Sequence, residues 1–268
     1  LGFGLRLRRE YLEPLLQIQP AVDWFEIISE NYLEADESAL RRLLQLRAKY
    51  PLVLHGTSLA VGSPWPLDQN YLNNLRRLID RLEPEWISDH LCWSGADDTQ
   101  GQLLPLPYYR DTLDHVVHRV RQVQDLLGRR ILLENVPANP LNSPAEIPEA
   151  EFLAELAEAS DSLILIDISN LHASSVIQGF DPQAYLRQIP KDRVQQIHLA
   201  GALTLCQPQS TSTTENGDPI WELYTDALRR FGPVSTMIER IDTIASLDEM
   251  IQELQKGGRS VPRLLSPA

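Results

Sequence analysis

Six short apolar runs in this chain each end on a side chain that can bind a metal ion. Short runs rich in Val, Ile and Leu are typical of buried parallel strands. A carboxylate or imidazole at the last position of such a strand has left the apolar layer, so six such ends indicate one shared site. The runs and their terminal residues are PLVLH at His55, EWISDH at Asp89 and His90, ILLE at Glu134, LILID at Asp167, VQQIH at His198 and VSTMIE at Glu239.

The segments between these runs predict the architecture. Strands are expected over residues 2–6, 23–29, 51–55, 86–89, 130–134, 162–167, 194–198 and 234–239. Helices are expected over about 10–18, 37–49, 68–82, 109–127, 150–159, 182–188, 218–230 and 247–255. This alternation favours βα units and a parallel sheet. Eight units in 268 residues predict an α/β fold of the (β/α)₈ TIM-barrel type, with the active site at the C-terminal ends of the strands. The alternative, a doubly wound open sheet, gives no reason for the six ends to converge.

Composition predicts one enzyme-sized domain and limits its partners. An apolar fraction of 43% supplies one large core, so we expect a single domain over 1–256 and a disordered tail over 257–268. Two cysteines, Cys92 and Cys206, favour a reducing, cytoplasmic location over a disulfide framework. A net charge of −13 argues against a nucleic-acid partner, and no apolar run is long enough to span a membrane.

The strand-end side chains indicate a metal centre. Three imidazoles with several carboxylates and no thiolate suit iron, manganese or zinc. The set is too large for one tetrahedral zinc that keeps a water, whereas two metals bridged by a carboxylate would use it better. Asp89 is a further ligand or a group that supports one, and a turn cap is the simpler alternative.

Each of these residues also has an ordinary structural alternative. A histidine after a strand is commonly a hydrogen-bonded structural residue, and Glu239 has a neighbouring ion-pair partner in Arg240. The other histidines are interpreted as structural or solvated, although His172 lies near the Asp167 loop. Cys92 is interpreted as a small buried side chain rather than a ligand.

A set of motifs in a fixed order resembles a known family. The chain is similar to DUF692 (UPF0276), the multinuclear non-heme iron-dependent oxidative enzymes, which include oxidases of the methanobactin-biosynthesis type. The matching segments run from residue 2 to about 255 and are specific as a set. They are GFGLR (2–6), DWFEIISENY (23–32), YPLVLHGTSLAVGS (50–63), SDHLCWS (88–94), LLPLPY (103–108), ILLENV (131–136), DISN (167–170), IHLAG (197–201), DPIWELY (218–224) and IER (238–240).

The resemblance implies a xylose-isomerase-like barrel that holds two or three irons. It also implies oxidation with O₂ of a ribosomally made precursor peptide, typically at cysteine, with a small partner protein that presents the leader peptide. Glu134 would bridge two metals, and the catalytic residues would be Asp89, Glu134 and Asp167. The metal ligands carried over by motif are His55, His90, Glu134, Asp167, Asn170, His198 and Glu239.

Departures from the family pattern cluster near the strand that ends at His198. Ala202 stands where the family usually has histidine, and Ser210–Ser212 replaces an Asp-Thr-His segment. Ser169 and the displaced Asp242 are smaller departures. We therefore expect a two-metal site, iron first with manganese or zinc as alternatives, from which the third metal has been lost. A divalent-metal isomerase or hydrolase and a non-catalytic peptide-binding scaffold remain alternatives.

Overall fold

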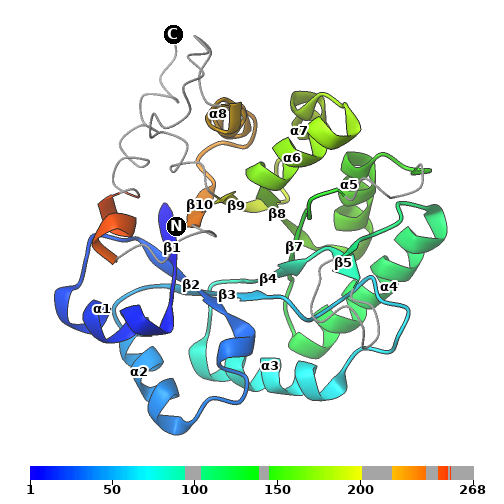
Figure 1. Cartoon of the computed structure of the whole chain (residues 1–268). Helices are drawn as coiled ribbons and strands as arrows, with labels where there is room; N and C mark the ends of the chain where they lie inside the picture. Colours follow the sequence, from blue (N-terminus) through cyan, green and yellow to red (C-terminus); the bar gives the residue numbers. More distant parts are fainter. Residues whose placement is uncertain (94–103, 139–144, 201–218, 240–246, 253, 255–268) are drawn as a thin grey trace.

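Eight parallel strands close into a barrel in the computed structural model, which describes residues 1–93, 104–138, 145–200, 219–239, 247–252 and 254 (Figure 1). The order around the barrel is β1-β10-β9-β8-β7-β4-β3-β2. The prediction of a (β/α)₈ barrel is confirmed. The barrel strands are β1 (Phe3–Arg6), β2 (Trp24–Ile28), β3 (Leu52–Gly56), β4 (Ile87–His90), β7 (Leu132–Glu134), β8 (Leu163–Asp167), β9 (Val194–Ala200) and β10 (Ser235–Glu239).

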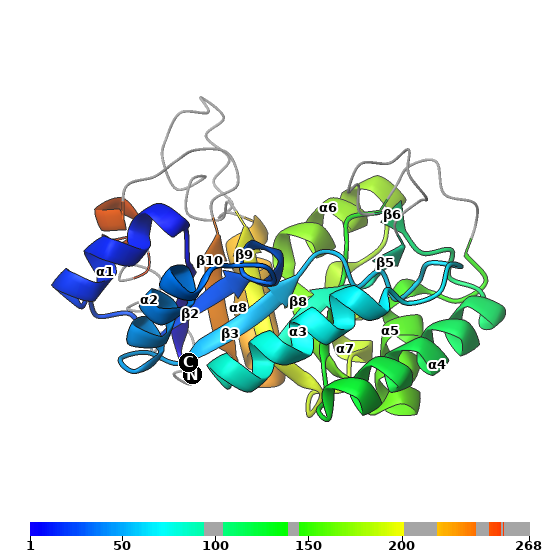
Figure 2. The same ribbon diagram turned by 90° about the horizontal axis from the view of Figure 1, so that it is seen from below.

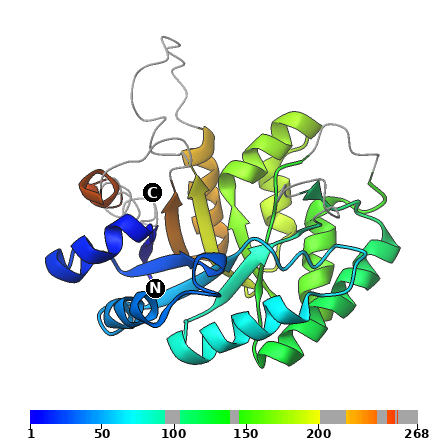
Figure 3. The same cartoon turned by 60° about the horizontal axis from the view of Figure 1, so that its bottom comes forward.

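The helices lie outside the barrel, where Figures 2 and 3 show them around the strands. The predicted helices are present, with ends that differ by a few residues. They are α1 (Leu12–Ile18), α2 (Glu37–Arg47), α3 (Gln69–Leu82), α4 (Arg110–Leu127), α5 (Glu149–Ser160), α7 (Pro182–Gln188) and α8 (Pro219–Phe231), with residues 247–252 also helical. Short 3₁₀ turns, η1 (Arg9–Tyr11) and η2 (Ser29–Asn31), follow β1 and β2.

One layer of large apolar side chains fills the barrel below the strand ends. These side chains pack together as a separate cluster and are buried. Side chains two residues apart point to the same face of a strand. The residue two positions after each member of this layer therefore also points into the barrel, closer to the C-terminal ends of the strands. The layer consists of Trp24, Val53, Trp86, Leu132, Leu165 and Met237.

Two features were not predicted. Helix α6 (Ile168–Gln178) begins directly after β8, in a segment for which no helix was predicted. Its sequence, ISNLHASSVIQ, has three serines and no continuous apolar stripe, so the periodicity is weak. The Asp167 side chain starts the helix by accepting a hydrogen bond from the Asn170 N–H at 2.7 Å.

The second unpredicted feature is a small antiparallel pair, β5 (Cys92–Trp93) and β6 (Leu104–Pro105), whose strands are too short to leave a period in the sequence. Several expectations lie outside the described residues: the tail 257–268, and the departures at Ala202, Ser210–Ser212 and Asp242. Within the described part of the chain, every helix is too short or too polar to cross a bilayer.

Candidate metal centre

Most of the inward-facing residues directly above the apolar layer are ionisable. Glu26, His55, Glu134 and Asp167 each lie two positions after a member of that layer, on β2, β3, β7 and β8. His198 lies on β9, opposite Met237 of β10 in the strand register. All five side chains are almost completely buried. The alternation of the strands thus places a ring of imidazoles and carboxylates across the C-terminal mouth of the barrel.

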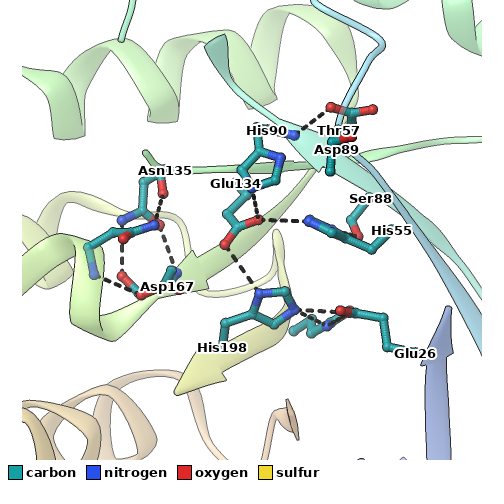
Figure 4. A network of polar contacts seen from close by, with 12 residues as sticks. Glu26, His55, Thr57, Ser88, Asp89, His90, Glu134, Asn135, Asp167 and His198 are labelled. Carbon is teal, nitrogen blue, oxygen red and sulfur yellow. Dashed lines mark hydrogen bonds and ion pairs between the residues drawn. The ribbon is translucent and has the colours of Figure 1, made fainter. Parts of the chain in front are cut away.

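Glu134 lies at the centre of this ring (Figure 4). Its Oε2 atom is 3.4 Å from Nε2 of His55 and 3.4 Å from Nε2 of His90. Its Oε1 atom is 3.2 Å from Nδ1 of His198. The two carboxylate oxygens therefore face different histidines, which is the arrangement that a bridging carboxylate requires.

Two neighbouring side chains fix the orientation of the histidine rings. Nδ1 of His55 lies 2.8 Å from the Ser88 hydroxyl, which leaves Nε2 directed toward Glu134. On the other side, Nε2 of His198 lies 2.9 Å from Oε2 of Glu26. Such hydrogen bonds select the tautomer and the ring angle of a ligand histidine.

Glu26 was not predicted as a site residue. Its carboxylate accepts a hydrogen bond from Nε2 of Gln196 at 2.6 Å and pairs with Arg6 at 3.2 Å. One signal could have identified it: Glu26 interrupts the apolar run WFEII, and a fully buried carboxylate is costly unless it is paired. The strand-end criterion missed it because β2 continues for two residues beyond Glu26.

Three sets of ligand atoms lie close enough for one ion each, with all atoms of a set within 4.8 Å of one another. His55, Glu134 and His198 each belong to two of the sets. The sets are Glu26, His55 and His198; His55, His90 and Glu134; and Glu134, Asp167 and His198.

The residues present fit metal ions. Among the described residues, Oε2 of Glu134 and Nδ1 of His90 are buried without a hydrogen-bond partner. A buried carboxylate oxygen without a donor is costly, and a cation between it and the facing imidazoles would satisfy it. The donor set of imidazole and carboxylate with no thiolate matches iron, manganese or zinc.

The ionisation of the cluster supports the same conclusion. Burial lowers the pKa of His55 to about 3, against the opposing Glu26 and Glu134 charges. Burial would also lower the pKa of His198, but the charges of Glu26 and Glu134 outweigh the effect of burial and raise this pKa to about 10. Burial would raise the pKa of Glu134, but the imidazoles, His198 first, lower it to about 2. A proton on His198 therefore balances the buried carboxylates, and a metal cation can take its place.

The end of β8 is held by Asn135. The Asn135 side chain donates to the Asp167 carbonyl at 3.0 Å and accepts from the Asp167 N–H at 2.8 Å. The Asn135 carbonyl in turn accepts a hydrogen bond from Nδ2 of Asn170 at 3.1 Å. With Nδ2 engaged in this hydrogen bond, the side-chain oxygen Oδ1 of Asn170 is the atom that could bind a metal. Burial and the Glu134 charge raise the pKa of Asp167 to about 7.

Asp89 lies apart from the three sets of ligand atoms. It is the neighbour of inward-facing His90, so strand alternation directs it to the other face of β4. Its carboxylate accepts hydrogen bonds from the N–H groups of Leu59 at 3.1 Å and of His90 at 2.7 Å. Burial and the nearby Glu30 carboxylate raise the pKa of Asp89 well above its usual range. A Cβ at Gly56 would lie 2.2 Å from the Asp89 carboxylate, so a larger residue at this position would have to displace that carboxylate.

The remaining candidates separate into two groups. Glu239 is the last residue of β10 and pairs in register with Ala200, but its side chain is outside the described part of the structure. His115 lies on α4 with Nε2 3.0 Å from the Ser63 carbonyl, in agreement with a structural role. Cys92 is a buried free cysteine, as its interpretation as a packing residue requires.

Comparison with known proteins gives a family match over nearly the whole chain. The family model described as "RiPP precursor modification enzyme MbnB/TglH/ChrH" matches residues 2–260. A UPF0276 protein of Anaeromyxobacter sp. (strain Fw109-5) is 43% identical over 258 residues, covering 96% of this chain and 91% of the relative. A UPF0276 protein of Acaryochloris marina is 41% identical over 260 residues, covering 95% and 93%.

Solved structures share the fold at low sequence identity. An L-ribulose 3-epimerase aligns with a TM-score of 0.65 and 14% identity, over 100% of this chain and 99% of that one. A xylose isomerase domain-containing protein from Salmonella typhimurium aligns with a TM-score of 0.64 and 12% identity, over 98% and 97%. Endonuclease IV from Thermus thermophilus aligns with a TM-score of 0.61 and 16% identity, over 98% and 99%. At these identities the likeness shows the barrel alone, which is of the xylose-isomerase-like kind.

Proposed function

Because this chain belongs to the MbnB/TglH/ChrH family of RiPP precursor modification enzymes, we propose that it oxidatively modifies a ribosomally made precursor peptide with iron and O₂. Cysteine is the proposed site of modification. The observation that carries the proposal is the position of Glu134, whose two oxygens face His55 and His90 on one side and His198 on the other.

Two ions are proposed, with Glu134 between them. His55, His90 and Glu134 would hold one ion, and Glu134, Asp167 and His198 would hold the other. Asn170 and Glu239 remain proposed as additional ligands. Bound there, iron would supply the redox chemistry that side chains lack, with O₂ as the oxidant and the peptide thiolate as the group oxidised.

The protein's own residues prepare the site for that chemistry. Ser88 and Glu26 hold the rings of His55 and His198, so the ligand nitrogens are oriented before metal or substrate arrives. The apolar layer beneath keeps water from the lower face of the cluster. Asp89 is proposed as catalytic together with Glu134 and Asp167. Its carboxylate accepts a hydrogen bond from the backbone N–H of His90 and so holds that residue in position. A small partner protein that presents the leader peptide is part of the proposal.

The test begins with metal content after anaerobic purification with iron supplied. We expect about two irons per chain, coupled in the Mössbauer spectrum, as the bridging position of Glu134 requires. The variant His55→Ala should lose iron, whereas His118→Ala, which removes an exposed histidine on α4, should keep it. Iron content near zero in a folded wild-type protein would refute the proposal, and three irons would refute the loss of the third site.

Turnover is tested next with a cysteine-containing precursor peptide encoded beside the gene. We expect O₂-dependent consumption of the peptide and a changed peptide mass, both absent from His55→Ala. Activity on a small sugar without O₂, with manganese or zinc preferred, would instead establish the isomerase or hydrolase alternative. Peptide binding without turnover would establish the scaffold.

A further inference from the structure

A cavity of about 310 Å³ lies outside the barrel, between the segments that follow β7 and β8. It is lined by the start of α5, the end of α6 with the chain that follows it, and α7, with Tyr108 from the segment before α4. Figure 1 shows α5, α6 and α7 side by side in this region. Helix α5 begins at the C-terminal end of the barrel, the end at which the metal centre lies, and its first residues line the cavity.

One carboxylate is placed among aromatic rings in this cavity. Glu149, the first residue of α5, accepts a hydrogen bond from the Tyr185 hydroxyl at 3.0 Å. The Tyr108 hydroxyl also hydrogen-bonds the Glu149 carboxylate. Phe180 stacks on Tyr185 with ring centroids 6.0 Å apart and lines the same space. Both tyrosines are almost completely buried.

The lining is acidic. Asp181, the second carboxylate of the lining, already pairs with Arg187 at 3.1 Å and caps the start of α7, so Glu149 is the carboxylate available to a bound cation. None of the described lining residues is a lysine, arginine or histidine. Phenol hydroxyls are the only side-chain donors that hydrogen-bond Glu149 among the described residues. A largely enclosed carboxylate that receives only neutral donors gains more from a charged donor, because charge-assisted hydrogen bonds are about twice as strong as neutral ones.

The shape and size favour a single extended side chain. Cavities for small molecules begin at about 300 Å³, so this one accommodates one long side chain rather than a folded segment. Aromatic faces beside a carboxylate attract a cation electrostatically while their apolar surface packs against an alkyl stem. Just before the lining residue Gln178, α6 exposes Val176 and Ile177, which are 70% and 45% accessible and offer an apolar surface for neighbouring residues of a bound chain.

We propose that this cavity binds a lysine or arginine side chain of the precursor peptide, with Glu149 as its ion-pair partner. The inference rests on the proposed function for the identity of the bound chain. Binding there would anchor the peptide beside the helices that follow β7 and β8, the two strands that carry Glu134 and Asp167. The net charge of −13 also favours a basic peptide, because an acidic protein attracts positively charged partners.

The first experiment uses blocked amino acids as probes. Nα-acetyl-lysine N-methylamide is titrated into protein labelled at the alanine methyl groups, and its uncharged isostere Nα-acetyl-norleucine N-methylamide serves as the ligand control. Three alanines line the cavity and report on it by NMR: Ala145, Ala150 and Ala184. We expect saturable shifts of these three resonances with the lysine probe, and with an arginine probe, but not with norleucine.

Variants assign the effect to the carboxylate. Glu149→Gln should raise the Kd of the lysine probe about tenfold or more, the effect of one charge-assisted hydrogen bond. Glu151→Gln, which removes the same charge two residues further along α5 and outside the cavity, should leave the Kd unchanged. Ala184→Leu keeps Glu149 but fills the space from α7, so it should abolish binding even if Glu149→Gln does not fold.

The outcomes separate this inference from the proposed function, because probe binding needs neither iron nor turnover. Equal shifts with norleucine, no shifts at tens of millimolar probe, or an unchanged Kd in Glu149→Gln would overturn the cavity proposal while leaving the iron chemistry standing. Probe binding in a protein that takes up no iron would support the cavity and refute the oxidase. With the precursor peptide, replacement of the anchoring basic residue by norleucine should raise KM and leave kcat nearly unchanged.

Discussion

At the scale of single residues, Asn135 shows how one side chain positions two others. Its side chain forms two hydrogen bonds with the Asp167 backbone, and its backbone carbonyl accepts a hydrogen bond from the Asn170 side-chain amide. These bonds join the residue that follows β7 to the last residue of β8. Asn135 is therefore a positioning residue for the proposed second ion.

We predict that Asn135→Ala weakens both metal binding and the fold. Loss of a side chain that orients ligands typically costs about 10–100-fold in metal affinity. The free energy of unfolding should fall by about 1–3 kcal/mol, because buried backbone groups of Asp167 lose their partners. Competition with a chelator measures the first quantity and urea unfolding the second. Asn73→Ala, on the exposed surface of α3, is the control, and equal metal affinity in both variants would contradict the prediction.

Glu149 gives a pH dependence that can be assigned to one group. Burial raises its pKa to about 7, against the hydrogen bonds from Tyr185 and Tyr108. Asp181 is the other carboxylate lining the cavity. The folded protein thus holds a proton that the unfolded chain releases near pH 4.5, so stability from this group is present below that pH and is lost as pH rises toward 7.

We predict that Glu149→Gln removes the loss of folding stability that Glu149 causes as pH rises toward 7. The stability of the variant relative to wild type should rise by about 1–3 kcal/mol between pH 4 and pH 8, because glutamine stays neutral throughout. Denaturant unfolding across this range measures the difference, and Glu151→Gln controls for the lost charge. A difference that stays flat with pH would show that Glu149 has an ordinary pKa.

At the scale of elements, the junction between β8 and α6 serves two purposes. Asp167 ends the strand as a candidate ligand and begins the helix as its N-cap. A helix that starts without a connecting loop keeps Asn170, one turn later, close to the same site. The absence of a loop explains why strand and helix signals overlap in this segment of the sequence.

We predict that two substitutions at Asp167 separate these roles. Asn is as good an N-cap as Asp, whereas Ala is a poor one. Asp167→Ala should therefore be about 0.5–2 kcal/mol less stable than Asp167→Asn when both are metal-free. Both variants should lose affinity for the second ion, as measured by metal content. Equal stability of the metal-free variants would indicate that the cap contributes nothing to α6.

At the scale of the whole molecule, the closed barrel brings carboxylates and imidazoles from different strands into one buried cluster. There the carboxylates repel one another and pair with the imidazoles. Glu26, Glu134 and Asp167 are buried within one cluster with three imidazoles. Anything that binds this cluster in the folded state stabilises the folded state by mass action. The metal centre should therefore contribute to stability and not only to catalysis.

We predict that removing metal lowers the melting temperature. At a free metal concentration of about one hundred times Kd, binding adds about 2.7 kcal/mol, or roughly 5–10 °C for a chain of this size. Scanning calorimetry of the loaded protein with and without chelator measures the shift. The variant Glu134→Gln, which loses the bridging charge, should show a much smaller shift. An equal shift in that variant would place the stabilising metal elsewhere.

The sequence alone determined the eight barrel strands, most of the helices and five of the six residues in the three sets of ligand atoms. The physical reason is that buried parallel strands need unbroken apolar runs, and an ionisable residue is tolerated where such a run ends. His55, His90, Glu134, Asp167 and His198 could be selected on that ground before any geometry was known.

Only the tertiary structure decided which of the candidate side chains face one another. Glu26 joins the centre, and Asp89 turns away from it, because strand alternation around a closed barrel assigns each residue to one face. The cavity around Glu149 likewise joins segments from before α4 to α7 that are distant in the chain. Such juxtapositions depend on barrel closure and helix packing, and no local pattern in the sequence records them.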